Sequence, residues 1–489
     1  MEYISTRNNK KAFTFEYAFL KGLAPDGGLF IPKTLKKFSN DELKSFRNLS
    51  YQELAKKVIF PFIGNFMSES ELSDIIKKSY SSFRKDNVVQ LLNGQHNALE
   101  IDILELFHGP TLAFKDIAMQ LIGDFYEHHL NKNNKSINII VATSGDTGAA
   151  AINAIKGKKY INIFVLHPHN KISTVQRKIM TTTKEKNVFN IAIEGNFDDC
   201  QNLVKSMFSD HNFSNLINMS GVNSINWARI IAQTVYYFYG YFQSEYVKSF
   251  DYKKPINFSV PTGNFGDVYA GYLAKKIGLP VNKLIVATND NDILHRAISN
   301  GNYEVKKTLQ TLAPSMDIQV ASNFERLIYD LNDYSDIETE KVMHEIKKTG
   351  RYKISKDKIE KIKKNFLSAS LNEREIKDIM RKLSLSGYKN SISKQKNDPI
   401  IVDPHTAIGL GAIEKILKES KDSGVNIIDR HSTISLSTAH PAKFPEAAKN
   451  IYGIVDLPEG LSHVMKEKEI FNIMDNNIEI VKNYILKKI

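Results

Sequence analysis

The stretch LFHGPTLAFKD, residues 106–116, places a lysine directly after a Gly-Pro turn, at the start of an apolar pattern. From Phe114 to Phe125 the apolar residues recur every three or four positions, which predicts a helix with one buried stripe. Lys115 lies at the margin of that stripe. A cation at a helix start faces the positive end of the helix dipole, so local stability does not explain this residue. We therefore expect a chemical role for Lys115.

The composition predicts a folded protein of more than one domain. The chain has 489 residues, more than one compact core usually holds, and 42% of them are hydrophobic and 10% aromatic. The single cysteine, Cys200, cannot form an intrachain disulfide, which favours a reducing compartment, the cytoplasm. The two aspartates that precede Cys200 would raise its pKa, so a nucleophilic role is not expected.

The charge pattern argues against nucleic acid and membrane partners. The formal net charge is +12, but the basic and acidic residues are interleaved and no aromatic-plus-basic cluster stands out. A basic protein of this kind would still attract an anionic substrate. The N-terminus lacks the apolar core of a secretory signal, and apolar runs such as residues 229–242 are too short to span a bilayer. We expect a soluble protein.

Seven short runs rich in β-branched residues follow residue 100, and most precede helical stretches. They are SINIIVAT (136–143), YINIFVLH (160–167), VFNIAIEG (188–195), INFSVP (256–261), KLIVATN (283–289), PIIVDP (399–404) and STISLST (432–438). Strands that alternate with helices predict the α/β class, with an open and mainly parallel sheet. Ligands of such sheets bind beyond the carboxyl ends of the strands.

The chain divides into a leading domain and a catalytic region. Residues 1–95 are mostly helical and polar in pattern, which predicts a separate N-terminal domain before the region 96–489. Between about 335 and 398 the sequence becomes lysine-rich with a helical rhythm. We expect surface helices there, joined through a flexible link to the strand predicted at 399–404.

Three loops connect the end of a predicted strand to the start of a predicted helix. The loop ATSGDTGAAA (142–151) offers hydroxyls and free N–H groups at a helix start, a natural cradle for a carboxylate or phosphate. The glycines of PTGNFGDVYAG (261–271) let the backbone close around an anion. Neither loop has the spacing of the common nucleotide-binding fingerprints. LSTAHPAKF (436–444) places Thr438 at a strand end and His440 beside a proline.

Each of these loops, taken alone, reads equally well as an ordinary connection between a strand and a helix. Together with Lys115 they fit one kind of site. A partly desolvated lysine amine can form a Schiff base with an aldehyde cofactor, while two glycine loops hold the cofactor phosphate and the substrate carboxylate.

LFHGPTLAFKD resembles the cofactor-lysine segment of threonine synthases, pyridoxal-phosphate enzymes of the fold-type II group. Further segments resemble that family in the family's order: YISTRN, GLAPDGGLFIP, ATSGDTG, VNSINWARI, PTGNFGD, APSMDIQVASNFERL and LSTAHPAKF. The resemblance extends over most of the chain and is to the longer subgroup of fungi and many bacteria. It implies open sheets with helices on both faces, a mainly helical N-terminal domain and a catalytic region of two α/β subdomains.

Carried onto this sequence, the resemblance implies that Lys115 holds pyridoxal phosphate and then shuttles protons. The residues it places at the cofactor are Lys115, Gly263, Asn264, Phe265, Gly266, Asp267 and Thr438, and those at the substrate carboxylate are Ser144, Gly145, Asp146, Thr147 and Gly148. Thr438 would face the pyridine nitrogen, which a neutral hydroxyl need not keep protonated. Relatives often carry asparagine where this chain has Asp146, so no direct contact from Asp146 to the cofactor's phenolic oxygen is assigned.

The reaction implied by the resemblance converts O-phospho-L-homoserine and water to L-threonine and phosphate. The expected partner is therefore a small-molecule substrate, without an obligate protein partner. The nearest rival is a related phospho-lyase that releases a 2-oxo acid and uses the same lysine and loops. A non-catalytic relative would be expected to have lost the lysine or the phosphate loop, and both are intact here.

Several polar residues near these motifs have more than one interpretation. Arg229, His440 and Lys443 are candidates for binding the substrate phosphate, although each is equally plausible as a surface or ion-pair residue. A structural role is expected for the others: Asn223 and Asn226 as helix caps, His108 in its turn, and His167 and His169 at a strand end. No carboxylate or thiol cluster accompanies these histidines, so no metal site is expected.

Overall fold

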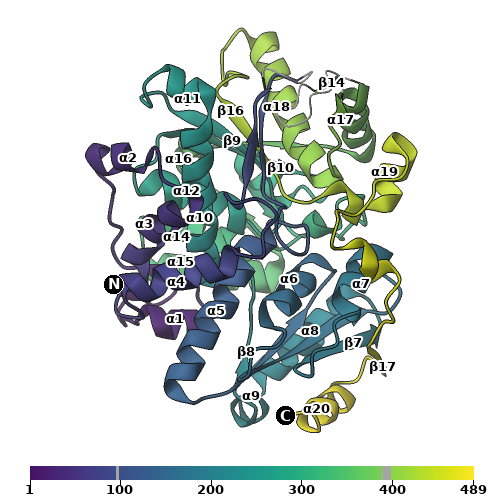
Figure 1. Cartoon of the computed structure of the whole chain (residues 1–489). Helices are drawn as coiled ribbons and strands as arrows, with labels where there is room; N and C mark the ends of the chain where they lie inside the picture. The colour runs from purple at the N-terminus through teal and green to yellow at the C-terminus, as the bar shows by residue number, and fades with distance from the viewer. Residues whose placement is uncertain (95–98, 386, 389–397) are drawn as a thin grey trace.

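The computed structural model describes the whole chain except residues 95–98, 386 and 389–397. Two mainly parallel sheets, each with helices on both faces, occupy the upper and lower halves of the molecule in Figure 1. The flexible link predicted before residue 399 falls largely on 389–397 and so lies outside the described residues. The predicted α/β class is confirmed.

The lower sheet has five strands in the order β17-β7-β6-β5-β8, and all of its pairs are parallel. Its strands are β5 (Ile137–Ala142), β6 (Ile161–Pro168), β7 (Val188–Glu194), β8 (Met219–Ser220) and β17 (Asn472–Asp475). Ile139 and Val141 of β5 pack into one apolar cluster, whereas Ile140 between them packs into another. Alternate residues of a strand point to opposite faces, so both faces of this sheet are buried.

Helices supply the other half of those clusters. On one face lies α6 (Asp146–Ile155), and on the other lie α8 (Phe197–Ser209) and the C-terminal α20 (Ile478–Leu486). Two further helices, α7 (Thr174–Thr181) and α9 (His211–Leu216), and the short η4 (Ser462–Met465) complete this half of the molecule.

The upper sheet has six strands in the order β13-β10-β9-β16-β4-β3, and only the edge pair of β3 and β4 is antiparallel among the described strands. Its strands are β3 (Gln90–Leu92), β4 (Asp102–Glu105), β9 (Ile256–Pro261), β10 (Val281–Thr288), β13 (Phe366–Ser370) and β16 (Thr433–Ser437). Leu284 and Val286 of β10 pack into one cluster, and Ile285 and Ala287 into another. Both faces of the upper sheet are therefore buried as well.

The helices of this half divide between the two faces. One cluster contains residues of α10 (Trp227–Gln243) and α12 (Gly266–Lys276), and the other contains residues of α17 (Glu373–Leu385) and α18 (Pro404–Ser423). The shorter elements of this half are α11 (Glu245–Ser249), α13 (Ile293–Asn300), β11 (Asn302–Glu304), η2 (Pro314–Met316), β14 (Gly387–Tyr388), η3 (Pro441–Lys443) and α19 (Pro445–Tyr452).

The N-terminal segment is mainly helical, as predicted. It contains the antiparallel pair β1 (Tyr3–Ser5) and β2 (Phe30–Pro32), followed by helices, with α1 between the two strands: α1 (Phe15–Lys21), α2 (Asn40–Phe46), α3 (Tyr51–Ile63) and α4 (Glu69–Tyr80). The last three helices each begin with a capping box, in which Ser39, Ser50 and Ser68 exchange hydrogen bonds with a glutamate three residues on. These pairs set where each helix starts.

This segment shares its core with the rest of the chain. Phe19 packs against Phe125 and Tyr126 of α5 (Lys115–Asn133), with ring centroids 5.9 and 4.5 Å apart. Aromatic contacts of this kind add to the area they bury, so they fasten the N-terminal segment to the helix that carries Lys115. The domain boundary at residue 95 stays a prediction.

Six of the seven predicted strands are present, as β5, β6, β7, β9, β10 and β16. The strand predicted at 399–404 is wrong. Only Asp398–Pro399 pair, as the short β15, and the chain from 400 to 403 is irregular before α18 begins at Pro404. Asp403 caps that helix, accepting from the N–H groups of His405 and Thr406. The Asp-Pro helix start thus outweighs the β-branched run that precedes it.

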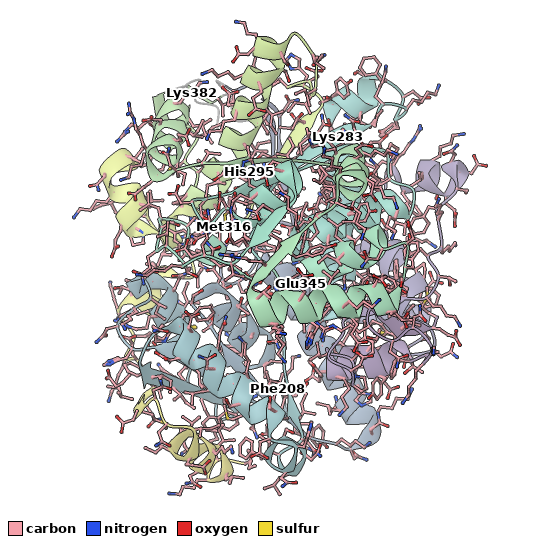
Figure 2. All side chains as sticks on the ribbon, turned by 180° about the vertical axis from the view of Figure 1, so that it is seen from behind. Phe208, Lys283, His295, Met316, Glu345 and Lys382 are labelled. Carbon is pink, nitrogen blue, oxygen red and sulfur yellow. The ribbon has the colours of Figure 1, made fainter. Side chains whose placement is uncertain are left out.

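The helical prediction for about 335–398 is wrong at residues 366–370, which form β13 at the edge of the upper sheet. The other described residues of this stretch are mostly helical as expected, with α15 (Asp336–Thr349), α16 (Lys356–Asn365) and α17, together with the short β12 (Arg351–Lys353) and β14. Figure 2 shows Glu345 of α15 and Lys382 of α17 on the rear of the molecule, and both are exposed. The strand β13 is short and lies between lysine-rich helices, so the sequence pattern gives no clear strand signal there.

The helix α14 (Phe324–Leu331) fastens the N-terminus to the catalytic region. The Glu325 carboxylate is buried and accepts hydrogen bonds from the Thr6 hydroxyl at 2.6 Å and from two nitrogens of Arg7 at 2.9 and 2.7 Å. A bidentate arginine pair with one buried partner is among the stronger polar contacts in proteins. Two segments more than 300 residues apart in the sequence are thereby joined.

The next residue of the same helix extends this attachment. Arg326 is fully buried and donates to Phe30 O at 3.0 Å and to Ile225 O at 2.7 Å, with its guanidinium 5.4 Å from the Trp227 ring centroid. Burial lowers its pKa to about 10, so it still carries its charge at neutral pH. The residue supplies donors to the buried carbonyl of Phe30 and to the part-buried carbonyl of Ile225.

None of the helices in the described part of the chain combines the length and the apolar character needed to cross a membrane.

We predict that Arg326→Met lowers the free energy of unfolding by about 3 kcal/mol, because the buried carbonyl of Phe30 and the part-buried carbonyl of Ile225 lose their donor. The measurement is urea unfolding of the full-length chain, followed by far-ultraviolet circular dichroism. The matched control is Arg374→Met, whose arginine side chain is 91% exposed, and which should change stability by less than about 0.5 kcal/mol. Equal stability of the two variants would contradict the role given to Arg326.

Candidate active site

The turn before Lys115 is built to present the residue at the start of α5. The Asp116 carboxylate accepts from the Thr111 N–H at 2.8 Å and from the Thr111 hydroxyl at 2.6 Å. A Cβ on Gly109 would lie 2.4 Å from the Asp116 Cβ, so only glycine fits there. The segment that looked unusual in the sequence is thus a tight local unit with Lys115 at its end.

The segment after β16 runs alongside this turn. Leu106 N–H donates to Ser437 O, Phe114 N–H to Thr438 O, and His440 N–H to Leu112 O, at 2.9, 2.9 and 3.0 Å. These backbone bonds place the buried Thr438 directly beside the start of α5. Two motifs separated by more than 300 residues of sequence are therefore neighbours.

The Lys115 amine is held at the edge of the core by two oxygens. It lies 3.3 Å from Asp146 Oδ2 and 3.3 Å from the Ser315 hydroxyl, and 12% of the side chain is exposed. Burial lowers its pKa, the Asp146 charge raises it, and the positive charges of Lys443 and Arg229 lower it again. The net shift is downward, so this amine gives up its proton more readily than an ordinary lysine.

The loop between β5 and α6 is folded by Thr143, whose hydroxyl accepts from the N–H groups of Gly145 and Gly148, both at 2.9 Å. Gly145 has φ of +133°, a conformation that only glycine adopts without strain. Ser144 and Thr147 are half-buried, and neither hydroxyl has a hydrogen-bond partner among the described residues. The loop thus offers two free hydroxyls at a helix start, beside Asp146.

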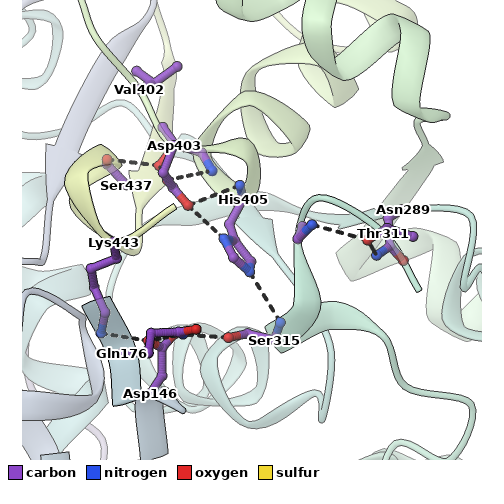
Figure 3. A network of polar contacts seen from close by, with 12 residues as sticks. Asp146, Gln176, Asn289, Thr311, Ser315, Val402, Asp403, His405, Ser437 and Lys443 are labelled. Carbon is purple, nitrogen blue, oxygen red and sulfur yellow. Dashed lines mark hydrogen bonds and ion pairs between the residues drawn. The ribbon is translucent and has the colours of Figure 1, made fainter. Parts of the chain in front are cut away.

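Asp146 is the centre of the polar network in Figure 3. Its Oδ1 accepts from Gln176 Nε2 at 3.0 Å and pairs with Lys443 Nζ at 2.5 Å, and its Oδ2 accepts from the Ser315 hydroxyl at 2.9 Å. Burial alone would raise the pKa of Asp146, but the charges of Lys443 and Lys115 hold it well below its ordinary value. This carboxylate is therefore ionised in the folded chain.

A buried histidine supports Ser315 from the other side. His405 Nε2 accepts from the Ser315 N–H at 3.3 Å, and His405 Nδ1 lies 2.6 Å from Asp403 Oδ2 (Figure 3). An Nε2 that accepts implies that Nδ1 carries the proton and donates to Asp403. The Thr406 hydroxyl contacts the same carboxylate and lies 2.9 Å from the Ser437 hydroxyl.

These supporting residues were missed from the sequence. Ser315 lies in a family-like segment, but its sequence context shows no link to Lys115, and Asp403 was read as part of a strand. The capping pattern of an aspartate before Pro404 was the available signal, and it locates the helix rather than its contact with Ser315.

The loop between β9 and α12 has the form of an anion cradle. The N–H groups of Gly263, Asn264 and Phe265 have no acceptor among the described residues, and Phe265 has φ of +64°. A Cβ on Gly263 would lie 2.9 Å from Ser315 O. Free N–H groups at a helix start bind phosphate well, because the helix dipole adds to their hydrogen bonds.

Asn323, just before α14, holds this loop from behind. Its backbone N–H and its side-chain amide both donate to Asn264 O at 3.1 Å, and the amide also donates to Ser224 O at 3.1 Å. With its carbonyl fixed on one side, the peptide of Asn264 cannot rotate freely. The position of the loop therefore depends on the same helix that anchors the N-terminus.

Asp267 faces away from this loop, toward α10. Its carboxylate accepts from the hydroxyls of Tyr236 and Tyr237 at 2.5 and 2.8 Å, and burial raises its pKa to about 6 against those two bonds. The residue joins α12 to α10. Its predicted place at the cofactor phosphate is not tested by these contacts.

The three candidates for an anion differ in what they offer. Arg229 is 4% exposed and donates to Val222 O at 3.3 Å, and its Nε has no acceptor among the described residues. Burial, together with the charge of Arg84, lowers the pKa of His440 to about 4, so it is neutral at pH 7. Lys443 is occupied by Asp146. Of the three, Arg229 is the free cation.

The other singled-out residues have structural contacts. Asn226 caps α10 through the Ala228 N–H, as predicted, and His108 Nε2 lies 2.9 Å from Glu105 Oε2. Burial and the charge of Asp199 raise the pKa of the Cys200 thiol to about 12, which agrees with an unreactive cysteine.

The two histidines after β6 differ in their surroundings. His169 Nδ1 lies 2.6 Å from Glu194 Oε1. His167 is buried without a hydrogen-bond partner among the described residues, and burial lowers its pKa to about 4. Nothing in these contacts assigns either residue to the site around Lys115.

Three sequence profiles match the chain in succession. They are described as "Threonine synthase N terminus" at residues 2–80, "Pyridoxal-phosphate dependent enzyme" at 104–354 and "Threonine synthase, C-terminal" at 406–485. The threonine synthase of Saccharomyces cerevisiae is 40% identical over 514 residues, covering 99% of this chain and 97% of the relative. The chain belongs to the threonine synthase family.

Other relatives agree with this assignment. The threonine synthase of Pseudomonas aeruginosa is 40% identical, covering 99% of this chain and 98% of its own length. The crystal structure of threonine synthase from Brucella melitensis, described as bound to PLP, superposes with a TM-score of 0.88 at 39% identity and covers 100% of this chain and 99% of its own. The yeast threonine synthase structure gives 0.89 at 38%, covering 100% and 98%.

Membership of the threonine synthase family makes this chain a pyridoxal-phosphate-dependent enzyme of fold-type II, as predicted. The residues present fit the cofactor. Lys115 supplies an amine with a lowered pKa, and the Gly263 loop supplies unpaired N–H groups and a space that a Cβ would fill. The roles of the individual residues remain predictions.

We predict that Gly263→Ala weakens binding of pyridoxal phosphate by about tenfold, because its Cβ would displace the loop from Ser315 O. The dissociation constant is measured by titrating the cofactor-free, full-length chain and following its absorbance. The control is Gly157→Ala, just after the far end of α6, where a Cβ meets no atom within 4 Å but φ is +76°; it adds backbone strain away from the site and should leave cofactor affinity unchanged. Unchanged affinity in the Gly263 variant would remove the loop from the cofactor site.

Proposed function

We propose that this chain converts O-phospho-L-homoserine and water to L-threonine and phosphate. The observation that carries the proposal is the setting of Lys115, an amine of lowered pKa that contacts Asp146 and Ser315 and lies beside the Gly263 loop. Family membership supports the same reaction. The substrate is then a small, doubly anionic amino acid, which a basic protein attracts.

We propose that the charged and polar side chains around Lys115 have separate roles in this reaction. Pyridoxal phosphate, when bound, supplies an electron sink that acidifies the C–H bonds near the substrate's amino group. Lys115 is the base within reach, and it takes and returns protons through its Nζ. Ser315 and Asp146 hold that nitrogen in place through their oxygens. Such positioning is a large part of what a protein contributes to this chemistry.

The Ser144 to Gly148 loop is proposed to hold the substrate carboxylate. Its support is the two unpartnered hydroxyls of Ser144 and Thr147 at the N-terminus of α6. Thr438 is proposed to face the pyridine nitrogen, and its support is the row of backbone bonds that ties its segment to Lys115. The cofactor phosphate is assigned to the N–H groups of Gly263 to Gly266.

Arg229 is proposed to bind the substrate phosphate. Its guanidinium is buried, charged at neutral pH, and without a carboxylate partner among the described residues. A buried cation without a counter-ion is costly, and an incoming phosphate removes that cost. The neutral His440 is a weaker candidate for the same reason.

A phospho-lyase that releases a 2-oxo acid and phosphate remains the alternative within the enzyme class. It would use the same lysine, cofactor loop and cations, so only the product separates the two. A cytoplasmic location stays part of the proposal, supported by a single, buried and unreactive cysteine.

The first test supplies O-phospho-L-homoserine to the cofactor-loaded, full-length chain and measures threonine. Threonine is expected from the wild type. Lys115→Ala should be at least about 1,000-fold slower, because it lacks both the proposed base and the amine that binds the cofactor. A 2-oxo acid with phosphate, in place of threonine, would identify the phospho-lyase. No product at all from a folded and loaded wild type would reject both.

A second test concerns Arg229. We expect Arg229→Ala to raise KM for O-phospho-L-homoserine by about 10- to 100-fold, the effect of losing a charged hydrogen-bond donor, and Arg229→Lys to restore part of it. Binding of L-homoserine, which lacks the phosphate, should change little in either variant. Equal losses for both ligands would show that Arg229 acts on the fold and not on the phosphate.

A further inference from the structure

Lys443 is a second lysine at the same carboxylate as Lys115. It lies on η3, its side chain is 0% exposed, and its Nζ is 2.5 Å from Asp146 Oδ1. Lys115 contacts the other oxygen, Oδ2, at 3.3 Å and shares its amine with the Ser315 hydroxyl. One carboxylate thus faces two amines, and the contact with Lys443 is much the shorter.

The positive groups around this carboxylate outnumber it. Lys115 belongs to α5, Lys443 to η3 and Arg229 to α10, and the charges of Lys443 and Arg229 both lower the pKa of the Lys115 amine. Arg84 donates to Gly109 O in the turn before Lys115, at 2.5 Å, and its charge acts on the neutral His440. If every one of these groups carried its proton, the site would hold several buried charges without counter-ions, which is very unfavourable.

Two other acidic groups lie near these lysines. Asp116 of α5 accepts two hydrogen bonds from Thr111, and Asp403 accepts from His405 and the Thr406 hydroxyl. The His405 ring is neutral, because its Nε2 accepts a backbone N–H. Asp116 is also coupled to the charge of Lys443, but among the described residues Asp146 is the carboxylate that forms ion pairs with both Lys115 and Lys443.

We propose that Lys443 is the ammonium partner of Asp146 and a positioning residue that leaves Lys115 as the uncharged, nucleophilic amine. An uncharged amine has the lone pair that reacts with an aldehyde, whereas an ammonium does not. Lys443 Nζ forms the closer ion pair with Asp146, at 2.5 Å, and the positive charge of Lys443 opposes a proton on Lys115. This inference rests on the proposed function only in taking Lys115 as the cofactor lysine.

The direction of each effect follows from the charges. Loss of the Lys443 charge leaves Asp146 free to pair with Lys115, so the pKa of Lys115 should rise. Loss of the Asp146 charge leaves Lys115 beside Lys443 and Arg229 without a counter-ion, so the pKa of Lys115 should fall. A residue that merely filled space would not produce these opposite shifts.

The experiment titrates Lys115 directly. The full-length, cofactor-free chain is trace-labelled with acetic anhydride across a range of pH, and labelling of the Lys115 peptide is read by mass spectrometry. We expect Lys443→Met to raise the labelling midpoint of Lys115 by about one pH unit or more, and Asp146→Asn to lower it. Lys443→Arg keeps the charge and should keep the midpoint near that of the wild type.

The matched control is Lys276→Met. Lys276 lies on α12, is partly buried and forms an ion pair with Asp330 at 2.9 Å. This variant should leave the Lys115 midpoint unchanged. An unchanged or lowered midpoint in a folded Lys443→Met chain would overturn the proposal. If that variant does not fold, Asp146→Asn decides, since it keeps the shape of the side chain, and a midpoint that stays or rises there would equally overturn it.

The labelling uses neither substrate nor product. A chain that makes no threonine could therefore still show the expected shift in the Lys115 midpoint. A chain with an unchanged midpoint could still make threonine.

Discussion

The carboxylate of Asp146 is the contact on which the rest of the site depends. It joins Lys115 from α5, Gln176 from α7, Ser315 from η2 and Lys443 from η3. These elements belong to both halves of the molecule, so one buried charge links the two sheets at the site. A buried carboxylate is tolerated only when it is paired and hydrogen-bonded, and here four partners meet that requirement. The arrangement makes the geometry at Lys115 sensitive to every element involved.

Two backbone groups of the site are each held by a side chain that lies behind them. The Ser315 peptide is held by His405, and the carbonyl of Asn264 by Asn323. Asn323 lies two residues before Glu325, which binds Arg7 of the N-terminal segment. A small error in placing reacting groups costs much of the rate of an enzyme, so such supporting contacts matter as much as the groups that react. They also explain why the N-terminal segment shares a core with the catalytic region.

Much of the fold could be predicted because local patterns decided it. The runs that form β5, β6 and β10 are β-branched, bounded by turns and buried on both faces, so their pattern and their structure agree. The run at 399–404 has the same composition, yet the Asp-Pro pair starts a helix there. β13 lies among lysine-rich helices, and a five-residue strand leaves little periodic signal.

The sequence by itself determined the class of fold and the family and singled out Lys115 as the candidate cofactor lysine, because these depend on residue order and spacing over short distances. The tertiary structure decided which groups meet. Only folding brings Lys443 to Asp146, sets His405 behind Ser315, turns Asp267 toward α10 and leaves Arg229 without a carboxylate partner among the described residues. The physical reason is that a charge acts through space, and its partners are chosen by the packing of distant elements, which no local pattern records.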